Sequence, residues 1–219
     1  MPPRYNGRGP HVWWRWPTPH RSCWRPSRPR ACAATERRLS WRDSPDLAGG
    51  GLLADAGVHR LYLALYFFGP VREVRAVLDA PRPQGETFAV VILVFRSGAL
   101  GLIEANHHGP PGTFDDEIEI TGSEATLRLA GLESLFVGYR SGPALSMFRD
   151  RQWQEVPVRL DDWPTSVQAS VMAYLDAVTA GREPPVTGAA ALETISLLQR
   201  IYDTAAVLPG PAPGPRSPG

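Results

Sequence analysis

The sequence predicts an α+β fold: a mainly antiparallel, open-faced sheet with one helix at the start and two at the C-terminus. Two observations lead to this fold class. The middle of the chain holds successive short β-type segments with no helical pattern between them, and strands without crossover helices pair antiparallel. Helical spacing of apolar residues occurs only before and after that region. The 219 residues, 43% of them apolar, are enough for one sizeable core.

The first element is a helix that ends at Gly69-Pro70. Its apolar positions recur at helical spacing: Leu52, Leu53, Ala56, His59, Leu63 and Tyr66. Short β-type segments follow: Val71–Leu78, Phe88–Phe95, Ala99–Asn106, Glu117–Ile120, Leu127–Leu129, Leu135–Tyr139 and Met147–Val158. Phe88–Phe95 is apolar on both faces, as expected of a central strand.

Two helices are expected at the end of the domain. The first covers about 164–180, stops at Gly181 and places Val167, Val171, Tyr174, Leu175 and Val178 on one face. The second covers about 189–207 and aligns Leu192, Ile195, Leu198 and Tyr202.

The chain divides into three parts by composition. Residues 1–42 carry ten Arg and one acidic residue, whereas the rest has a net charge of −8; all 23 basic residues are Arg. We expect residues 1–40 to be an irregular Arg/Pro/Trp-rich segment, 41–208 to be the folded domain, and 209–219 to be a disordered Pro/Gly tail. We interpret the first segment as sequence that arose from a reading frame that was shifted or entered late, and not as natural protein sequence. A disordered basic arm is one alternative. A nucleic-acid-binding segment is another, which is not favoured.

Composition also argues against several classes of protein. No stretch approaches the ~20 apolar residues of a membrane helix, and no secretion signal is present. Cys23 and Cys32 are too few for a disulfide scaffold. We therefore expect a cytoplasmic protein with no metal site, and Asp115-Asp116-Glu117 is interpreted as a solvated strand start.

Residues 49–54 (GGGLLA) match the dinucleotide fingerprint G-x-G-x-x-A, and the strand after that helix ends in Asp79. The context does not fit a Rossmann fold, because Leu39–Ala48 is polar and contains Pro45. No second β-α unit follows. We interpret the glycines as allowing the helix start to lie close against another surface or a ligand.

Asp55 and His59 are four residues apart on the first helix, so they share a face. A carboxylate bonded to one imidazole nitrogen leaves the other free to exchange a proton with a substrate. An incidental helix pair is the alternative interpretation. His107 and His108, at the end of a strand, are candidates for lining a substrate pocket, or are loop histidines. Glu104 is interpreted as a residue of the sheet face.

Residues 41–71, with GGGLLADAGVH and the exit FGPV, resemble the start of the C-terminal domain of the glucose-fructose oxidoreductase / inositol dehydrogenase (Gfo/Idh/MocA) family. Residues 120–127 (ITGSEATL) are similar to the family's I-x-G-S-x-G-x-L turn, with Ala125 at a glycine position, which predicts strain or another turn type. Residues 186–206 resemble its closing helix.

The resemblance implies an NAD(P)-dependent oxidoreductase of sugars, inositols or related polyols. By resemblance, His59 moves the hydroxyl proton of the substrate while hydride goes to nicotinamide, and Asp55 orients the side chain of His59. It also implies homo-oligomers through the sheet face.

The family's N-terminal Rossmann domain and its E-K-P lysine have no counterpart here. We therefore expect a truncated substrate-side domain that does not bind NAD or NADP by itself, with a non-catalytic polyol-binding or oligomerisation module as the alternative.

Overall fold

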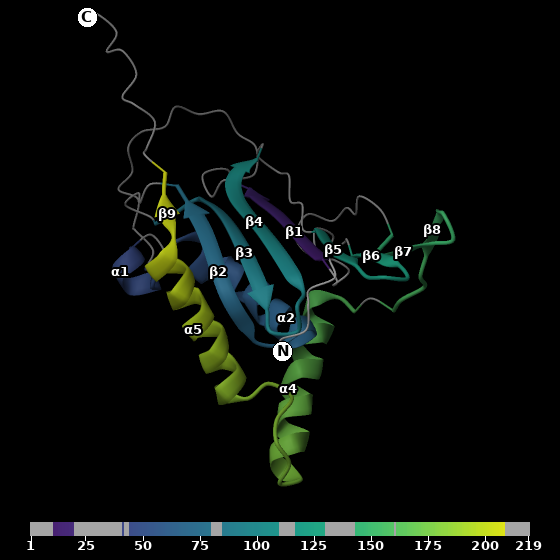
Figure 1. Cartoon of the computed structure of the whole chain (residues 1–219). Helices are drawn as coiled ribbons and strands as arrows, with labels where there is room; N and C mark the ends of the chain where they lie inside the picture. The colour runs from purple at the N-terminus through teal and green to yellow at the C-terminus, as the bar shows by residue number, and fades with distance from the viewer. Residues whose placement is uncertain are drawn as a thin grey trace, which may run out of the picture.

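The structure of the chain is a computed structural model that describes residues 11–19, 41, 44–79, 85–109, 117–129, 143–159 and 161–208. It confirms the α+β class (Figure 1). The described residues form nine strands: β1 (His11–Pro19), β2 (Val71–Leu78), β3 (Phe88–Phe95), β4 (Leu100–Gly109), β5 (Glu117–Thr121), β6 (Thr126–Leu129), β7 (Leu145–Arg149), β8 (Gln152–Glu155) and β9 (Ala206–Val207). The expected strand Leu135–Tyr139 lies outside the described residues.

The strands form one sheet in the order β8-β7-β6-β5-β1-β4-β3-β2-β9. Neighbours pair antiparallel except at two places, where β1 runs parallel to β4 and β9 runs parallel to β2. The predicted meander through β2, β3 and β4 is confirmed. The expected single strand Met147–Val158 is wrong, because the chain turns back at Asp150 and Arg151, which have positive φ, so that β7 and β8 form a hairpin.

Strand β1 corrects the expectation that residues 1–40 contain no regular element. Its backbone lies between β4 and β5, so both neighbours supply hydrogen-bonding partners. Pro17 and Pro19 masked the strand pattern, because proline cannot donate to a ladder. The pairing with β5 stops at Arg15, so both prolines lie beyond that ladder.

The helices are α1 (Pro45–Ala48), the π-helix η3 (Leu53–Gly57), α2 (Val58–Phe68), α4 (Trp163–Thr179) and α5 (Gly188–Thr204). Gly181 has the positive φ expected at the end of α4. The last helix is shorter than predicted. It ends at Thr204, because Ala205 is extended and residues 206–207 pair with β2 as β9.

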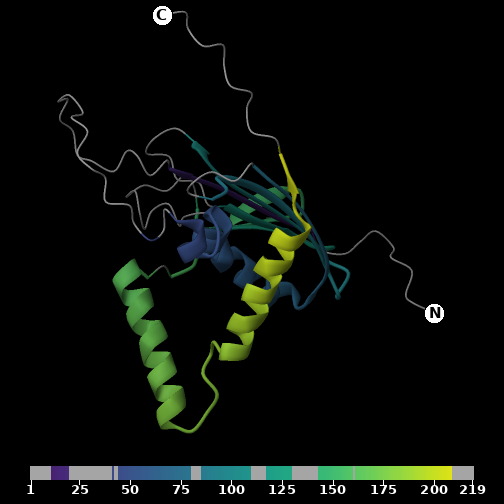
Figure 2. The same cartoon turned by 90° about the vertical axis from the view of Figure 1, so that its left-hand side faces the viewer.

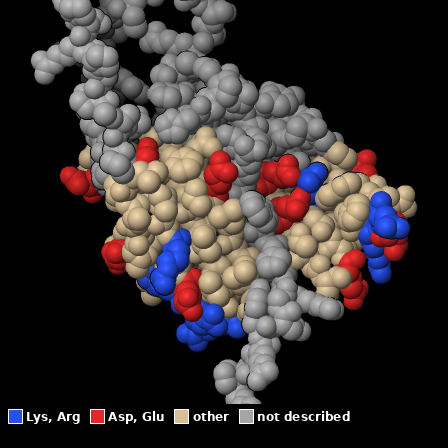
Figure 3. All heavy atoms as spheres, turned by 45° about the horizontal axis from the view of Figure 1, so that its top comes forward, with Lys and Arg blue, Asp and Glu red and all other residues tan. Residues whose placement is uncertain are grey.

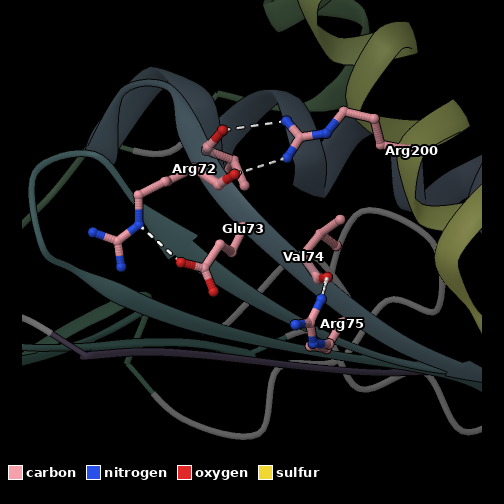
Figure 4. Close-up of polar contacts among 6 residues, drawn as sticks. Arg72, Glu73, Val74, Arg75 and Arg200 are labelled. Carbon is pink, nitrogen blue, oxygen red and sulfur yellow. Dashed lines mark hydrogen bonds and ion pairs between the residues drawn. The ribbon is translucent and has the colours of Figure 1, made fainter.

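The core lies between the sheet and the helices α2 and α5. On β3 alternate residues point into it, and the expected two-sided burial is wrong because the residues of the other face are half-buried or, at Ile92, exposed. The fully buried large side chains are Phe95, Leu53, Leu61, Leu93, Ile103, Leu197, Ile201 and Val91. The guanidinium of Arg200 on α5 donates to the carbonyl oxygens of Val71 (3.2 Å) and Arg72 (3.1 Å), which ties this helix to the start of β2 (Figure 4).

The face of the first helix differs from the predicted one. The π-helix holds one extra residue per turn, so the buried side advances by one position after it. Arg60 is therefore buried in place of His59, and Tyr66 is 70% exposed. Burial lowers the pKa of Arg60 to about 10.

Helix α4 projects away from the sheet (Figure 2). Its predicted apolar side is exposed, and Ala177 is the one buried residue that the helix contributes. None of the helices in the described ranges has the length and hydropathy of a membrane span. On the face drawn in Figure 3, acidic and basic side chains of the described residues are interspersed.

Candidate functional site

Asp55 and His59 lie on one continuous helical segment. Asp55 is half-buried within η3, and its backbone N–H donates to the Gly51 carbonyl oxygen over 3.0 Å. His59 is exposed in the first turn of α2. Short π-helical turns inside α-helices frequently occur at functional sites. The structure therefore places the histidine where a molecule in solvent can reach it, one helical turn beyond the carboxylate.

The start of this helical segment is held by one residue, Glu86, from the loop before β3. Its carboxylate accepts hydrogen bonds from the backbone N–H of Gly51 (2.8 Å) and of Leu53 (2.9 Å). Its main-chain carbonyl oxygen accepts a third from Leu52 N–H (2.9 Å). Three consecutive N–H groups at a helix start, which have no partner within the helix, are thus satisfied by a single residue.

Tyr202 on α5 completes this arrangement. Its hydroxyl donates to Oε1 of Glu86 over 2.8 Å. Burial raises the pKa of Tyr202 above its usual range, and the charge of Glu86 and the hydrogen bond to it raise it further. The carboxylate of Glu86 is itself buried, with 6% of the residue exposed. The helix start, the β3 loop and α5 therefore meet at one buried acidic group. We call Glu86 and Tyr202 the helix-start clamp.

The triple glycine is explained by the same contacts. A side chain at position 51 would overlap the backbone of Glu86, and one at position 50 would overlap the Tyr202 hydroxyl. Gly49 and Gly50 also have positive φ. The interpretation that the glycines permit close approach is thus confirmed, and the surface approached belongs to the chain itself.

The same geometry argues against a dinucleotide at this fingerprint. The N–H groups that would hold a pyrophosphate are bonded to Glu86. Asp79, the acid that would reach a ribose, accepts hydrogen bonds from the N–H groups of Thr87 (2.8 Å) and Phe88 (3.0 Å) and from the Thr87 hydroxyl (2.7 Å). Both groups have structural roles, so these residues do not fit the cofactor.

His107 and His108 lie near the C-terminal end of β4, and their side chains lie outside the described part of the structure. The register pairs Asn106 with Phe88, so the backbone beyond Asn106 continues at the end of β3 that follows Glu86. The two histidines therefore lie at the same end of the sheet as the helix-start clamp.

The remaining acidic candidates belong to the sheet surface. Glu104 is half-buried on the face opposite Ile103 and Ala105, and accepts a hydrogen bond from the Asn106 amide (3.1 Å). Asp115 and Asp116 lie outside the described residues.

Glu117 pairs with Nε of Arg128 (2.8 Å), and Glu119 with its Nη2 (2.9 Å). No group of His, Cys, Asp and Glu within the described ranges could hold a metal ion.

The turn at 122–125 is regular. Gly122 N–H donates to the Ala125 carbonyl oxygen (2.9 Å), and among the described non-glycine residues only Asp150 and Arg151 have positive φ. The expected strain at Ala125 is therefore not present, and the turn is of a type that accepts alanine.

Glu86 and Tyr202 were not predicted from the sequence. The one signal for them was the run of three glycines, which requires something to approach closely but does not say what. Glu86 lies 35 residues after Gly51 in the sequence, and Tyr202 lies 116 residues after Glu86. Only the tertiary structure brings them together.

Residues 18–206 match the family model described as "Oxidoreductase family, C-terminal alpha/beta domain" of Gfo/Idh/MocA. Among curated proteins the chain is similar to the D-apiose dehydrogenase of Rhizobium rhizogenes, at 29% identity over 74% of this chain and 49% of that protein. It is also similar to the D-apiose dehydrogenase of Paraburkholderia graminis, at 26% identity over 75% of this chain and 48% of that protein. The chain thus spans about half the length of the curated relatives it matches.

Solved structures share the fold. One is a 3-ketoreductase of Actinomadura kijaniata in complex with NADP and TDP-benzene, with a TM-score of 0.68 at 18% identity; 93% of this chain and 56% of that one are covered. Another is the UDP-N-acetylglucosamine 3-dehydrogenase of Acidithiobacillus ferrooxidans, with a TM-score of 0.64 at 14% identity; 91% of this chain and 55% of that one are covered.

Proposed function

The chain belongs to the Gfo/Idh/MocA oxidoreductase family, and from this premise we propose that residues 41–208 are the substrate-side domain of an NAD(P)-dependent dehydrogenase of a sugar, inositol or related polyol. The observation that carries the proposal is the placement of Asp55 and exposed His59 on a helix anchored at the end of the sheet where β4 also ends. The names of the curated relatives make D-apiose the first substrate to test.

Oxidation of an alcohol removes a proton from the hydroxyl oxygen and a hydride from the carbon that bears it. We assign the proton to His59, because an imidazole nitrogen can act as a general base toward a hydroxyl and this side chain is exposed. Asp55, on the same helical segment, is proposed to orient the imidazole. His107 and His108 are proposed to line the polyol site.

We assign no step to the dinucleotide in this chain. The N–H groups of Gly51 and Leu53, at the fingerprint glycines, are already bonded to the Glu86 carboxylate. The proposal is therefore that a domain outside residues 41–208 holds NAD or NADP. NADH fluorescence measured on this chain alone tests this: we expect no saturable change, and saturable binding would contradict it.

Calorimetric titration tests the substrate side. The full chain is titrated with D-apiose, myo-inositol and D-glucose, in the wild type, His59→Ala and the exposed control Glu124→Gln. We expect one polyol to bind saturably, with affinity roughly 5- to 10-fold weaker in His59→Ala and unchanged in the control, the effect of one hydrogen bond. Equal affinity in all three proteins would remove His59 from the site, and no binding of any polyol would contradict the substrate assignment.

A second candidate function is assembly through the open face of the sheet. On this face of β3, Ile92 is 46% exposed, and its neighbours across the sheet are Arg75 and Leu102. A second copy packed on this face would bury Ile92 and Leu102. Analytical ultracentrifugation tests it: we expect Ile92→Glu to dissociate the oligomer and Ile195→Glu, at an exposed position of α5, to leave it intact. A monomeric wild type would contradict this function.

A further inference from the structure

We propose that Glu86 is a positioning residue for Asp55 and His59, acting by fixing the start of the helix that carries them. The inference rests on the proposed function only in giving those two side chains a chemical role. Leu53, whose N–H is bonded to the Glu86 carboxylate, lies two residues before Asp55 and six before His59. A rigid helix transmits the position of its first turn to those side chains.

The bonding at Glu86 is more extensive than a helix cap requires. A helix cap usually satisfies one N–H of the first turn. Here two N–H groups bond the carboxylate and a third bonds the main chain of the same residue. Three hydrogen bonds therefore hold the start of the helix to a single residue, Glu86.

The same carboxylate connects the helix to the rest of the domain. Glu86 lies just before β3, and the first residue of that strand, Phe88, donates its N–H to the Asp79 carboxylate. The Tyr202 hydroxyl on α5 donates to the Glu86 carboxylate. Movement of the helix start thus requires breaking contacts to both the sheet and α5. In this way the clamp sets the place of Asp55 and His59 relative to the end of β4, where His107 and His108 lie.

Burial makes the arrangement sensitive to substitution. Charge-assisted hydrogen bonds are strongest away from water, and Glu86 is 6% exposed. Glu86→Gln keeps the shape of the side chain but has one acceptor oxygen in place of two. It cannot satisfy both Gly51 and Leu53, so the helix start should loosen.

The test uses nuclear magnetic resonance on the full chain without any ligand. Amide hydrogen exchange is measured in the wild type, Glu86→Gln and Tyr202→Phe. In Glu86→Gln we expect exchange at Gly51 and Leu53 to accelerate roughly 10- to 100-fold, the effect of losing a hydrogen bond to a charged group. Leu52 is expected to change less, because its partner is the main-chain oxygen.

The imidazole signals of His59 separate positioning from mere stabilisation. They should shift or double in Glu86→Gln and, to a smaller extent, in Tyr202→Phe. Ile201→Val is the control, since it lowers stability on the same helix as Tyr202 without removing a polar contact. It should leave the His59 signals unchanged.

Unchanged His59 signals in both clamp variants would overturn the proposal, as would equal shifts in the Ile201→Val control. If Glu86→Gln does not fold, Tyr202→Phe decides, because it removes a single hydroxyl. No polyol is added, so failure of the proposed substrate class leaves this result intact, and failure of the clamp leaves the polyol titration intact.

Discussion

Replacing Gly51 by alanine tests whether the helix start is packed as tightly as described. The new Cβ would overlap the backbone N and O and the carboxylate of Glu86, so the two segments must separate. Overpacking of this kind costs about 1–3 kcal/mol. Weakening of a hydrogen bond to the carboxylate adds about 1.5–3 kcal/mol, and the lower entropy of the unfolded chain returns about 0.4–1 kcal/mol. We therefore expect the free energy of unfolding to fall by about 2–5 kcal/mol.

Urea unfolding followed by far-ultraviolet circular dichroism measures this change. Gly188→Ala is the matched control, because a Cβ at the first residue of α5 meets no atom within 4 Å. It should stabilise the protein by about 0.4–1 kcal/mol. A Gly51→Ala variant as stable as the Gly188→Ala variant would refute the close approach of Glu86.

Three further predictions concern single contacts. Tyr202→Phe should remove a loss of stability that the wild type shows at alkaline pH. The raised pKa keeps the Tyr202 hydroxyl protonated in the folded state, whereas the same hydroxyl ionises near pH 10 in the unfolded chain. The free energy of unfolding of the wild type therefore falls by at most about 1.4 kcal/mol per pH unit above pH 10. Urea midpoints from about pH 9 to 11 measure it as the difference between the two proteins, because the chain has no lysine and Arg60, whose pKa is about 10, titrates in both; parallel curves for both proteins would contradict the contact. Arg200→Met should lower the free energy of unfolding by about 1–3 kcal/mol through the lost bonds to Val71 and Arg72, compared with a near-zero change for exposed Arg182→Met in the same urea assay. Asp162→Ala should reduce the helical circular dichroism of α4, because Thr165 N–H donates to the Asp162 carboxylate (2.9 Å). Hydrogen bonds with Thr165 lower the pKa of Asp162, so the helical circular dichroism of the wild type should also decrease as the pH falls through that pKa. A helical signal that does not change at acid pH would contradict the role of Asp162 as the N-cap of α4.

The sequence was sufficient to predict the elements whose residues carry their own periodicity. Strand β3 was predicted from an unbroken run of eight apolar residues, and the absence of helical patterns between β2 and β8 predicted antiparallel pairing. Helix α4 was placed within one residue at each end, because Pro164 and Gly181 mark its limits in the sequence. These features depend on local chemistry.

Tertiary contacts decide the features that were missed. Strand β1 contains two prolines and forms because β4 and β5 lie on either side of it. Residues 206–207 leave the helix to pair with β2, although their sequence continues the helical pattern. The π-turn shifts the buried face of the first helix by one residue, which a regular 3.6-residue period cannot indicate.

The candidate site was predicted in part for the same reason. Asp55 and His59 are close in sequence, so their spacing alone suggested a pair. Glu86 reaches the helix start from 35 residues away, and Tyr202 reaches Glu86 from 116. Nothing local distinguishes that glutamate from an ordinary loop residue.

A crystal structure of the full chain with its tightest-binding polyol would show whether His59 contacts the substrate. We expect a polyol hydroxyl oxygen within about 2.6–3.2 Å of an imidazole nitrogen of His59, with Glu86 still bonded to Gly51 and Leu53. A polyol bound away from His59, or one that displaces Glu86 from those N–H groups, would contradict this expectation.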